Sequence, residues 1–269
     1  MRHQSHAWPH VAALLALLFA AFLPNATRAQ TTATPNSDPR AVSFANQSFS
    51  ALVGSSPIND VTLSGTIVRT VGSDVGTGTV TLKALGTGQS RLDMNLSDGE
   101  RSEIRNLPSG IPQGYWIAPN SAVHSAANHN NMTDAAWFFP ALTVLSQASN
   151  SNFLFSYVGQ ELRNGSAVQH IRAAQSLGYA DSLMQGLTTE DIYLDANSFL
   201  PVALIFNAHP DNNALANIPV EVDFSNYQAV NGVKIPFRVQ QSFNGTLFLD
   251  ITIQSAALNT GLPSSDFVQ

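Results

Sequence analysis

Apolar and polar side chains alternate with a period of two along most of the chain after residue 60. Val220, Val222 and Phe224, for example, are separated by single acidic residues. Successive side chains of a β-strand point to opposite faces, so this alternation is typical of strands with one buried face. The pattern predicts strands near residues 60–70, 76–85, 89–97, 100–106, 114–118, 153–163, 166–175, 188–195, 200–207, 219–229, 233–243 and 246–257.

Three Asn-Gly pairs lie between these apolar-polar runs. Both residues tolerate positive φ, which the tight two-residue turns of β-hairpins require. The pairs therefore predict hairpins and an antiparallel arrangement of the strands that they join. They are Asn164-Gly165, Asn231-Gly232 and Asn244-Gly245.

The apolar faces also predict the register of two hairpins. A two-residue turn at 231–232 places Phe224 opposite Val239, so the two apolar faces agree. The same turn at 244–245 would place Val239 opposite Asp250, which would mix the faces. We therefore expect a bulged turn at Gly245 that shifts the pairing by one residue and places Val239 opposite Leu249.

Two segments carry helical signals instead. Residues 39–53 have Asp38 as a possible N-cap, Pro39 in the first turn and Gly54 beyond the last. Residues 132–148 predict a helical insert, with Thr133 as a possible cap and Pro140 dividing it. No strand-helix-strand rhythm is present, so the fold class is mainly β (α+β), with a single antiparallel meander of ten or more strands. A sheet of that length must curl or close.

The N-terminus has the features of a secretory signal peptide. A polar start with Arg2 is followed by an apolar run at residues 11–23, which is shorter than the ~20 residues of a membrane-spanning helix. Thr27 and Ala29 suit a cleavage site, so we expect residues 1–29 to be removed, residues 30–39 to be a disordered linker, and residues 40–269 to form one domain. The protein is then exported, periplasmic or secreted, with no transmembrane segment after cleavage.

Composition excludes several classes of function. Charged residues make up 11% of the 269 residues and there is no cysteine, while Ser, Asn, Thr and Gln together number 83. Cysteine-ligated zinc or iron–sulfur centres and cysteine nucleophiles are thereby excluded. Without residues 1–29, 10 basic and 18 acidic groups remain, a net charge of −8. Too few basic groups remain to form the patch that nucleic-acid binding needs.

The segment 219–240 carries a family resemblance. Its sequence PVEVDFSNYQAVNGVKIPFRVQ resembles the F-S-x-Y-x-x-V-x-G-V-x-I/L-P strand pair of bacterial exported proteins with the lipoprotein-carrier (LolA/LolB-like) fold. The order of the expected elements over residues 40–258 is similar too. This resemblance implies a curved open half-barrel around helices, with an apolar cavity that takes acyl chains. The chain contains no lipoprotein-binding motif that matches the family's.

Aromatic residues in and near the insert are the candidates for lining such a cavity. They either form ordinary core or face a ligand, and a concave, mostly apolar pocket is what an acyl chain requires. The expected cavity-lining residues are Trp116, Trp137, Phe138, Phe139, Phe153 and Phe155.

Catalytic and metal-binding signals are weak. His124 and His129 are five residues apart, which suits neither one face of a strand nor one face of a helix, and Asp134 follows. No G-x-S-x-G, S-x-x-K or H-E-x-x-H motif occurs, and no phosphate-binding loop. We therefore expect no cofactor and no metal.

Three hypotheses of function follow. The first is an exported, non-enzymatic binding protein that holds an apolar small molecule or lipid in a half-barrel cavity. The alternative is a structural or interaction module of the bacterial envelope, with a filled barrel as scaffold and an unidentified protein partner. The third is a metal-dependent enzyme built on His124, His129 and Asp134.

Overall fold

The computed structural model describes residues 36–176 and 182–269, and Pro35–Gln269 form one compact unit. The expected signal peptide, residues 1–29, and residues 30–35 of the expected linker lie outside the described residues. At the end of that linker, the Asp38 N–H donates to the Phe155 carbonyl at 2.7 Å, and a helix begins at Pro39. No helix in the described ranges is both long and apolar enough to cross a membrane.

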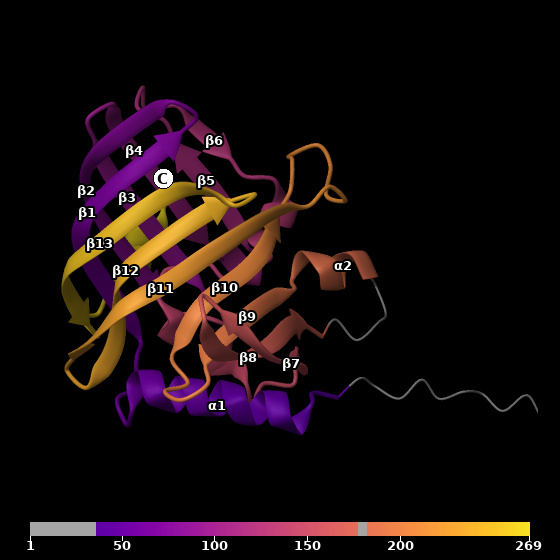
Figure 1. The fold of residues 1–269 in the computed structure, drawn as a ribbon. Coiled ribbons are helices and arrows are strands. Elements are labelled where there is room, and N and C mark those ends of the chain that lie inside the picture. Colours follow the sequence, from indigo (N-terminus) through magenta and orange to yellow (C-terminus); the bar gives the residue numbers. More distant parts are fainter. Residues whose placement is uncertain (1–35, 177–181) are drawn as a thin grey trace, which may run out of the picture. The chain divides into compact units, whose positions relative to one another are not determined.

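Thirteen strands of the described residues form one antiparallel sheet with the order β6-β5-β4-β3-β2-β1-β13-β12-β11-β10-β9-β8-β7 (Figure 1). The first six are β1 (Asp60–Val71), β2 (Asp74–Leu85), β3 (Gln89–Leu96), β4 (Gly99–Asn106), β5 (Gln113–Ile117) and β6 (Val123–Ser125). The others are β7 (Phe153–Arg163), β8 (Ser166–Gln175), β9 (Glu190–Asp195), β10 (Pro201–Ala208), β11 (Ile218–Val230), β12 (Val233–Phe243) and β13 (Thr246–Leu258).

Two meanders therefore meet in the middle of the sheet, where β1 pairs with β13. The outermost strands, β6 and β7, do not pair with each other, so the curved sheet is an open half-barrel. The predicted class, a mainly β antiparallel meander that curls around helical segments, is confirmed. The short β6 and the helix α2 (Ser182–Leu187) were not predicted.

The hairpin registers confirm one prediction and correct another. Phe224 pairs with Val239 as expected. The predicted bulged turn at Gly245 is wrong, because Asn244 and Gly245 form a tight turn with φ of 48° and 73°. The bulge lies three residues beyond Gly245, where Phe248 is the extra residue, and Val239 pairs with Ile251 instead of Leu249. Leu249 and Ile251 share a face, so both registers keep the apolar faces together.

The core covers the inner face of the curved sheet. Alternate residues of most strands point inward, and α1 (Pro39–Val53) packs against β7, β8 and β12 with Leu52 fully buried. The connection between β6 and β7 also lies in this core. The predicted insert at 132–148 is made of bends and the short 3₁₀ helices η3 (Pro140–Leu142) and η4 (Val144–Gln147) rather than α-helices. Pro140 explains part of this, since it removes a helical N–H donor.

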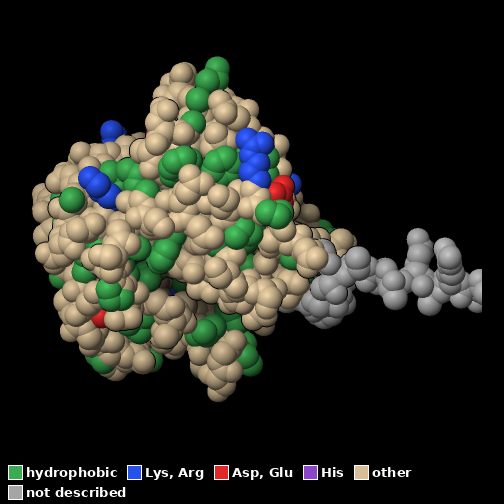
Figure 2. Space-filling view, turned by 90° about the horizontal axis from the view of Figure 1, so that it is seen from below, with side chains coloured by type: hydrophobic (Ala, Val, Ile, Leu, Met, Phe, Trp, Pro, Cys, Tyr) green, Lys and Arg blue, Asp and Glu red, His purple; other side chains and the backbone are tan. Residues whose placement is uncertain are grey.

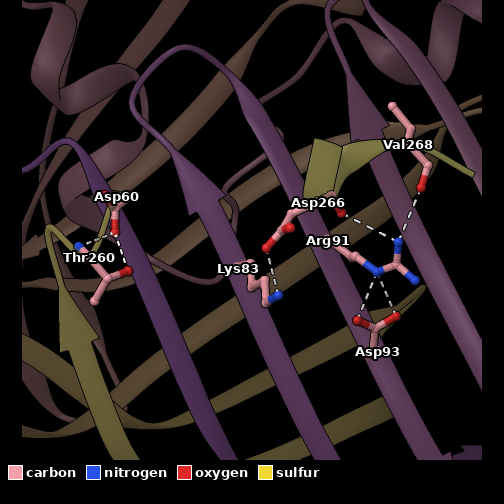
Figure 3. Close-up of polar contacts among 7 residues, drawn as sticks. All are labelled: Asp60, Lys83, Arg91, Asp93, Thr260, Asp266 and Val268. Carbon is pink, nitrogen blue, oxygen red and sulfur yellow. Dashed lines mark hydrogen bonds and ion pairs between the residues drawn. The ribbon is translucent and has the colours of Figure 1, made fainter. Parts of the chain in front are cut away.

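The C-terminal segment lies on the outer face of the first meander (Figure 3). Asp266, in the 3₁₀ helix η5 (Ser264–Phe267), pairs with Lys83 of β2 at 2.7 Å, and Arg91 of β3 donates to the Val268 carbonyl. Phe267 is fully buried beneath this segment, against β3 and β4. Nearby, Asp60 accepts hydrogen bonds from Thr260.

The surface reflects the composition. On the face shown in Figure 2, charged side chains are few and widely spaced, and apolar side chains are scattered among neutral polar ones. Strands provide this pattern, because every second residue points outward and many of those residues are Ser, Thr, Asn or Gln.

Candidate functional site

A pocket of about 250 Å³ opens at one end of the half-barrel. Its wall combines Arg105 and Gln113 from the first meander with Phe153 and Glu190 from the second. The connection between the meanders supplies the rest, from Asn131 to Ala135 together with Val144. The pocket thus lies where the two halves of the open sheet face each other across the insert.

The register of β4 turns charged residues toward this pocket. Glu103 pairs with Leu92 of β3, whose side chain belongs to the inner core, so Glu103 and Arg105 share the inner face. The intervening Ile104 points outward and is fully buried where η5 lies against β4. Strand β4 is therefore inverted relative to its neighbours, with its apolar side chain outside and its charges inside.

Arg105 is largely buried and only partly satisfied. Its Nε lies 3.7 Å from a carboxylate oxygen of Glu103, while its Nη1 is buried with no hydrogen-bond partner among the described residues. Burial lowers the pKa of the guanidinium, and the nearby Glu103 charge opposes that effect. An arginine nevertheless stays charged in proteins, so this donor needs an acceptor.

Two buried carboxyl groups face Arg105 across the pocket. Glu190 Oε1 accepts the Asp134 backbone N–H at 2.6 Å, and Asp134 Oδ2 accepts the Val144 N–H at 2.7 Å. Burial raises the pKa of Asp134 to about 6. Burial and the Asp134 charge raise the pKa of Glu190 well above its usual value. Two adjacent carboxyls in a buried site cannot both ionise cheaply, so ionisation of one carboxyl opposes ionisation of the other.

Asn131 completes the polar wall. Its side chain is buried, and its Oδ1 has no hydrogen-bond donor among the described residues. Asn131 Oδ1 occupies the space into which a Cβ of Gly114 would project. Gly114 pairs directly with Arg105 across β4 and β5. The unpartnered Arg105 donor and the unpartnered Asn131 acceptor thus belong to the same pocket wall, with Asn131 lying against the strand partner of Arg105.

The predicted cavity-lining aromatic residues occupy three different environments. Trp137, Phe138, Phe139 and Phe155 are buried in the main core. Phe153 is partly exposed and is the member of the predicted set that lines the pocket. Trp116 is 47% exposed and stacks on His124 of β6 with 3.9 Å between ring centroids. Contact of any of the six with a ligand stays a prediction.

The structure does not bring His124, His129 and Asp134 together. His129 Nε2 lies 3.1 Å from the Pro210 carbonyl, His124 stacks on Trp116, and Asp134 pairs with Glu190. The described residues contain no group of three or more His, Asp or Glu side chains placed to hold a metal ion.

Arg105, Asn131 and Glu190 were not among the site residues predicted from the sequence. The missing signal was the register of β3 and β4. Arg101, Glu103 and Arg105 alternate like a solvated face, and only the pairing with Leu92 shows that they point inward.

Comparison with known proteins places the fold. No family model and no curated protein sequence matches the chain. Among solved structures, a domain assigned to outer membrane lipoprotein sorting from Vibrio parahaemolyticus is similar, with a TM-score of 0.55, 13% identity and coverage of 85% of this chain and 96% of that one. A LolA superfamily protein from Nitrosomonas europaea has a TM-score of 0.52 at 11% identity, covering 85% and 97%.

A DUF1329 family protein from Desulfovibrio piger is similar over 87% of this chain and 98% of its own, with a TM-score of 0.56 and 11% identity. At such low identities the similarity concerns the fold alone. The chain has a LolA-like half-barrel fold, as the strand pair at 219–240 led us to expect.

Proposed function

We propose that this is an exported, non-enzymatic binding protein that holds an apolar or acyl, lipid-like ligand within the half-barrel. One observation carries the proposal: the concave face of the open sheet carries the main apolar core, interrupted by the charged residues of β4 and by Glu190, and the insert between β6 and β7 covers it with irregular turns. The LolA-like fold supports export to the bacterial envelope, as does the sequence of residues 1–29.

The insert can act as the cover of the binding site. It connects the two unpaired edges of the sheet and presents Trp137, Phe138 and Phe139 to the core. Burial of three such side chains contributes about 4.5–9 kcal/mol, at about 1.5–3 kcal/mol each. An acyl chain gains about 0.8 kcal/mol per buried methylene, so about six to eleven methylenes would replace these contacts. A long acyl chain therefore has enough apolar surface to displace the aromatic residues.

A different observation favours the alternative, a structural or interaction module of the envelope. The other space bounded by inner-face residues, between the insert residue Leu145 and β9–β11, holds only about 10 Å³. A barrel filled by its own side chains needs no ligand for stability. The two proposed functions differ in whether an apolar ligand can displace the insert from the core.

The test compares two variants that each remove one fully buried phenylalanine. Phe138→Ala creates space on the inner face, whereas Phe267→Ala creates it under the C-terminal segment on the outer face. Titration with a fluorescent long-chain acyl probe should show saturable binding to the wild type and tighter binding to Phe138→Ala, with no gain for Phe267→Ala. Absence of saturable binding to both the wild type and Phe138→Ala would overturn the proposal and favour the scaffold.

A further inference from the structure

The pocket at the end of the half-barrel has a polar wall that an apolar ligand alone leaves unused. Among the described residues, Arg105 Nη1 is a buried donor without an acceptor, and Asn131 Oδ1 and Glu190 Oε2 are buried oxygens without a hydrogen-bond partner. Buried polar groups are nearly always paired, because an unpaired one costs about 1–3 kcal/mol. Arg105 and Asn131 line the same pocket, and Asn131 lies against Gly114, the residue that pairs with Arg105, so a small group bound there lies close to both.

The remainder of the wall combines neutral polar residues, such as Gln113, Gln175 and Thr188, with apolar residues. Leu107, Met132, Val144 and Phe153 line the same pocket. Its volume, about 250 Å³, is below the ~300–1,000 Å³ of sites that enclose a whole drug-sized ligand. The pocket therefore suits one end of a molecule whose apolar remainder lies elsewhere, and the aromatic core under the insert is adjacent through Phe153 and Val144.

The charges of the wall limit what that end can be. Arg105 lies beside Glu103, and the carboxyl groups of Asp134 and Glu190 line the same wall. A carboxylate or phosphate would place a further negative charge beside these carboxyl groups in a desolvated site, which is unfavourable. An ammonium group would leave Arg105 without an acceptor and add a like charge beside it. An uncharged group with a carbonyl oxygen and an N–H or O–H satisfies both Arg105 and Asn131.

We propose that this pocket is a headgroup site for an uncharged amphiphile whose polar end both accepts and donates hydrogen bonds, such as a carboxamide or a monoacylglycerol. Arg105 donates to the carbonyl oxygen of the headgroup, and Asn131 accepts from its N–H or O–H. The acyl chain extends toward the space that the insert covers. This assignment rests on the proposed function, because it names the polar end of the ligand that the half-barrel would hold.

The test measures the affinity of the full chain for four amphiphiles with one common saturated chain. Their heads are a carboxamide, a glycerol monoester, a carboxylate and a primary ammonium. We expect the carboxamide and the monoester to bind at least about tenfold more tightly than the carboxylate, which cannot donate the hydrogen bond to Asn131 and places a negative charge beside Asp134 and Glu190. Equal affinity for all four heads, or tightest binding of the carboxylate, would overturn the headgroup site and leave the proposed function standing. Binding of none would overturn the proposed function itself.

Variants separate the roles of the wall. Arg105→Gln should weaken carboxamide binding about tenfold, while Arg238→Gln, an exposed arginine on β12, should leave it unchanged. Asp134→Asn combined with Glu190→Gln removes both carboxyl groups and should raise the affinity for the carboxylate relative to the carboxamide. Circular dichroism melting of each variant verifies that it is folded. Equal loss for Arg105→Gln and Arg238→Gln, or no change of preference in a folded double variant, would contradict the proposal.

Discussion

Glu190 and Asp191 are consecutive residues of β9, and the sheet gives them opposite environments. Glu190 points inward, where burial raises its pKa well above the usual value. Asp191 points outward; burial acts to raise its pKa too, but hydrogen bonds from His170 and Arg172 hold the pKa below its usual value. One peptide unit thus separates a carboxyl whose pKa is raised from one whose pKa is lowered.

The same difference extends over the whole sheet. On the outer face, charges form paired groups, such as Glu161–His170–Asp191 and Arg163–Glu221. In the pocket inside the half-barrel, Arg105, Asp134 and Glu190 are the charged or ionisable groups and lack such complete pairing. Buried ionisable groups with shifted pKa values cluster at functional sites. This difference makes the pocket the candidate site.

The largest expected effect contrasts core and surface directly. Phe139→Ala removes a fully buried ring under the insert and should lower the free energy of unfolding by about 3–5 kcal/mol. Leu162→Ala, at a residue near the end of β7 that is 73% exposed, should change it by no more than about 0.5 kcal/mol. Urea unfolding measures both. Similar losses for the two would mean that the insert does not pack as described.

The buried carboxyl pair should make stability depend on pH in an unusual direction. The pKa of Asp134 is about 6 in the folded state and 3.8 in the unfolded chain. The Asp134 carboxyl therefore stabilises the fold fully below pH 3.8, and this stabilisation is lost as the pH rises through about 6. The double variant Asp134→Asn with Glu190→Gln should not show this loss of stability. The loss amounts to up to about 3 kcal/mol for a pKa raised from 3.8 to about 6. Asp191 acts in the opposite sense, since its lowered pKa stabilises the fold at higher pH and this contribution is lost on acidification.

Unfolding of the wild type, the double variant and Asp191→Asn across that pH range gives the sign of each contribution. The wild type should lose stability relative to the double variant as pH rises, and relative to Asp191→Asn as pH falls. Parallel curves for all three would contradict the assignment of opposite environments.

Two glycines distinguish the crowded interior from the open edge. A Cβ at Gly114 would collide with Asn131 Oδ1, whereas a Cβ at Gly159 of β7 meets nothing within 4 Å. Gly114→Ala should therefore lower the free energy of unfolding by about 1–3 kcal/mol. Gly159→Ala should be neutral or slightly stabilising, by up to about 1 kcal/mol. Thermal melts of the two variants test the contrast, and a harmless Gly114→Ala would show that Asn131 can move aside.

The smallest expected effect concerns an outer-face ion pair. Arg238 and Asp250 lie 2.8 Å apart, with the Arg238 side chain 49% exposed. Arg238→Gln should lower the free energy of unfolding by less than about 1 kcal/mol, and by still less in high salt, which screens exposed charges. A larger, salt-independent loss would place this pair in a more buried environment than the outer face provides.

Much of the fold follows from local signals. The alternation and the Asn-Gly turns predicted the strands and the pairing of Phe224 with Val239, because a two-residue turn fixes the register of its hairpin. The direction of the bulge near Asn244 could not be predicted, since registers two residues apart bury the same face. The helical insert was predicted from its composition, but packing against the core imposes 3₁₀ turns there.

The candidate site was much less predictable. Arg105, Asp134 and Glu190 come from β4, the insert and β9, and only the meeting of the two meanders at β1 and β13 brings these elements together. The aromatic run at 137–139 was visible in the sequence, but a buried ring in the core and a ring that lines a ligand cavity have the same sequence signal. The assembly of the site residues and the environment of the aromatic rings both depend on long-range topology, which local periodicity does not encode.

The most direct test of the central claim is native mass spectrometry of the full chain purified from bacterial cells, followed by solvent extraction of any bound molecule. The account predicts that the protein carries an uncharged long-chain amphiphile in one-to-one stoichiometry. It also predicts that an added chain of the same class exchanges with the bound molecule. A single ligand-free mass, unchanged when long-chain amphiphiles are added, would contradict it.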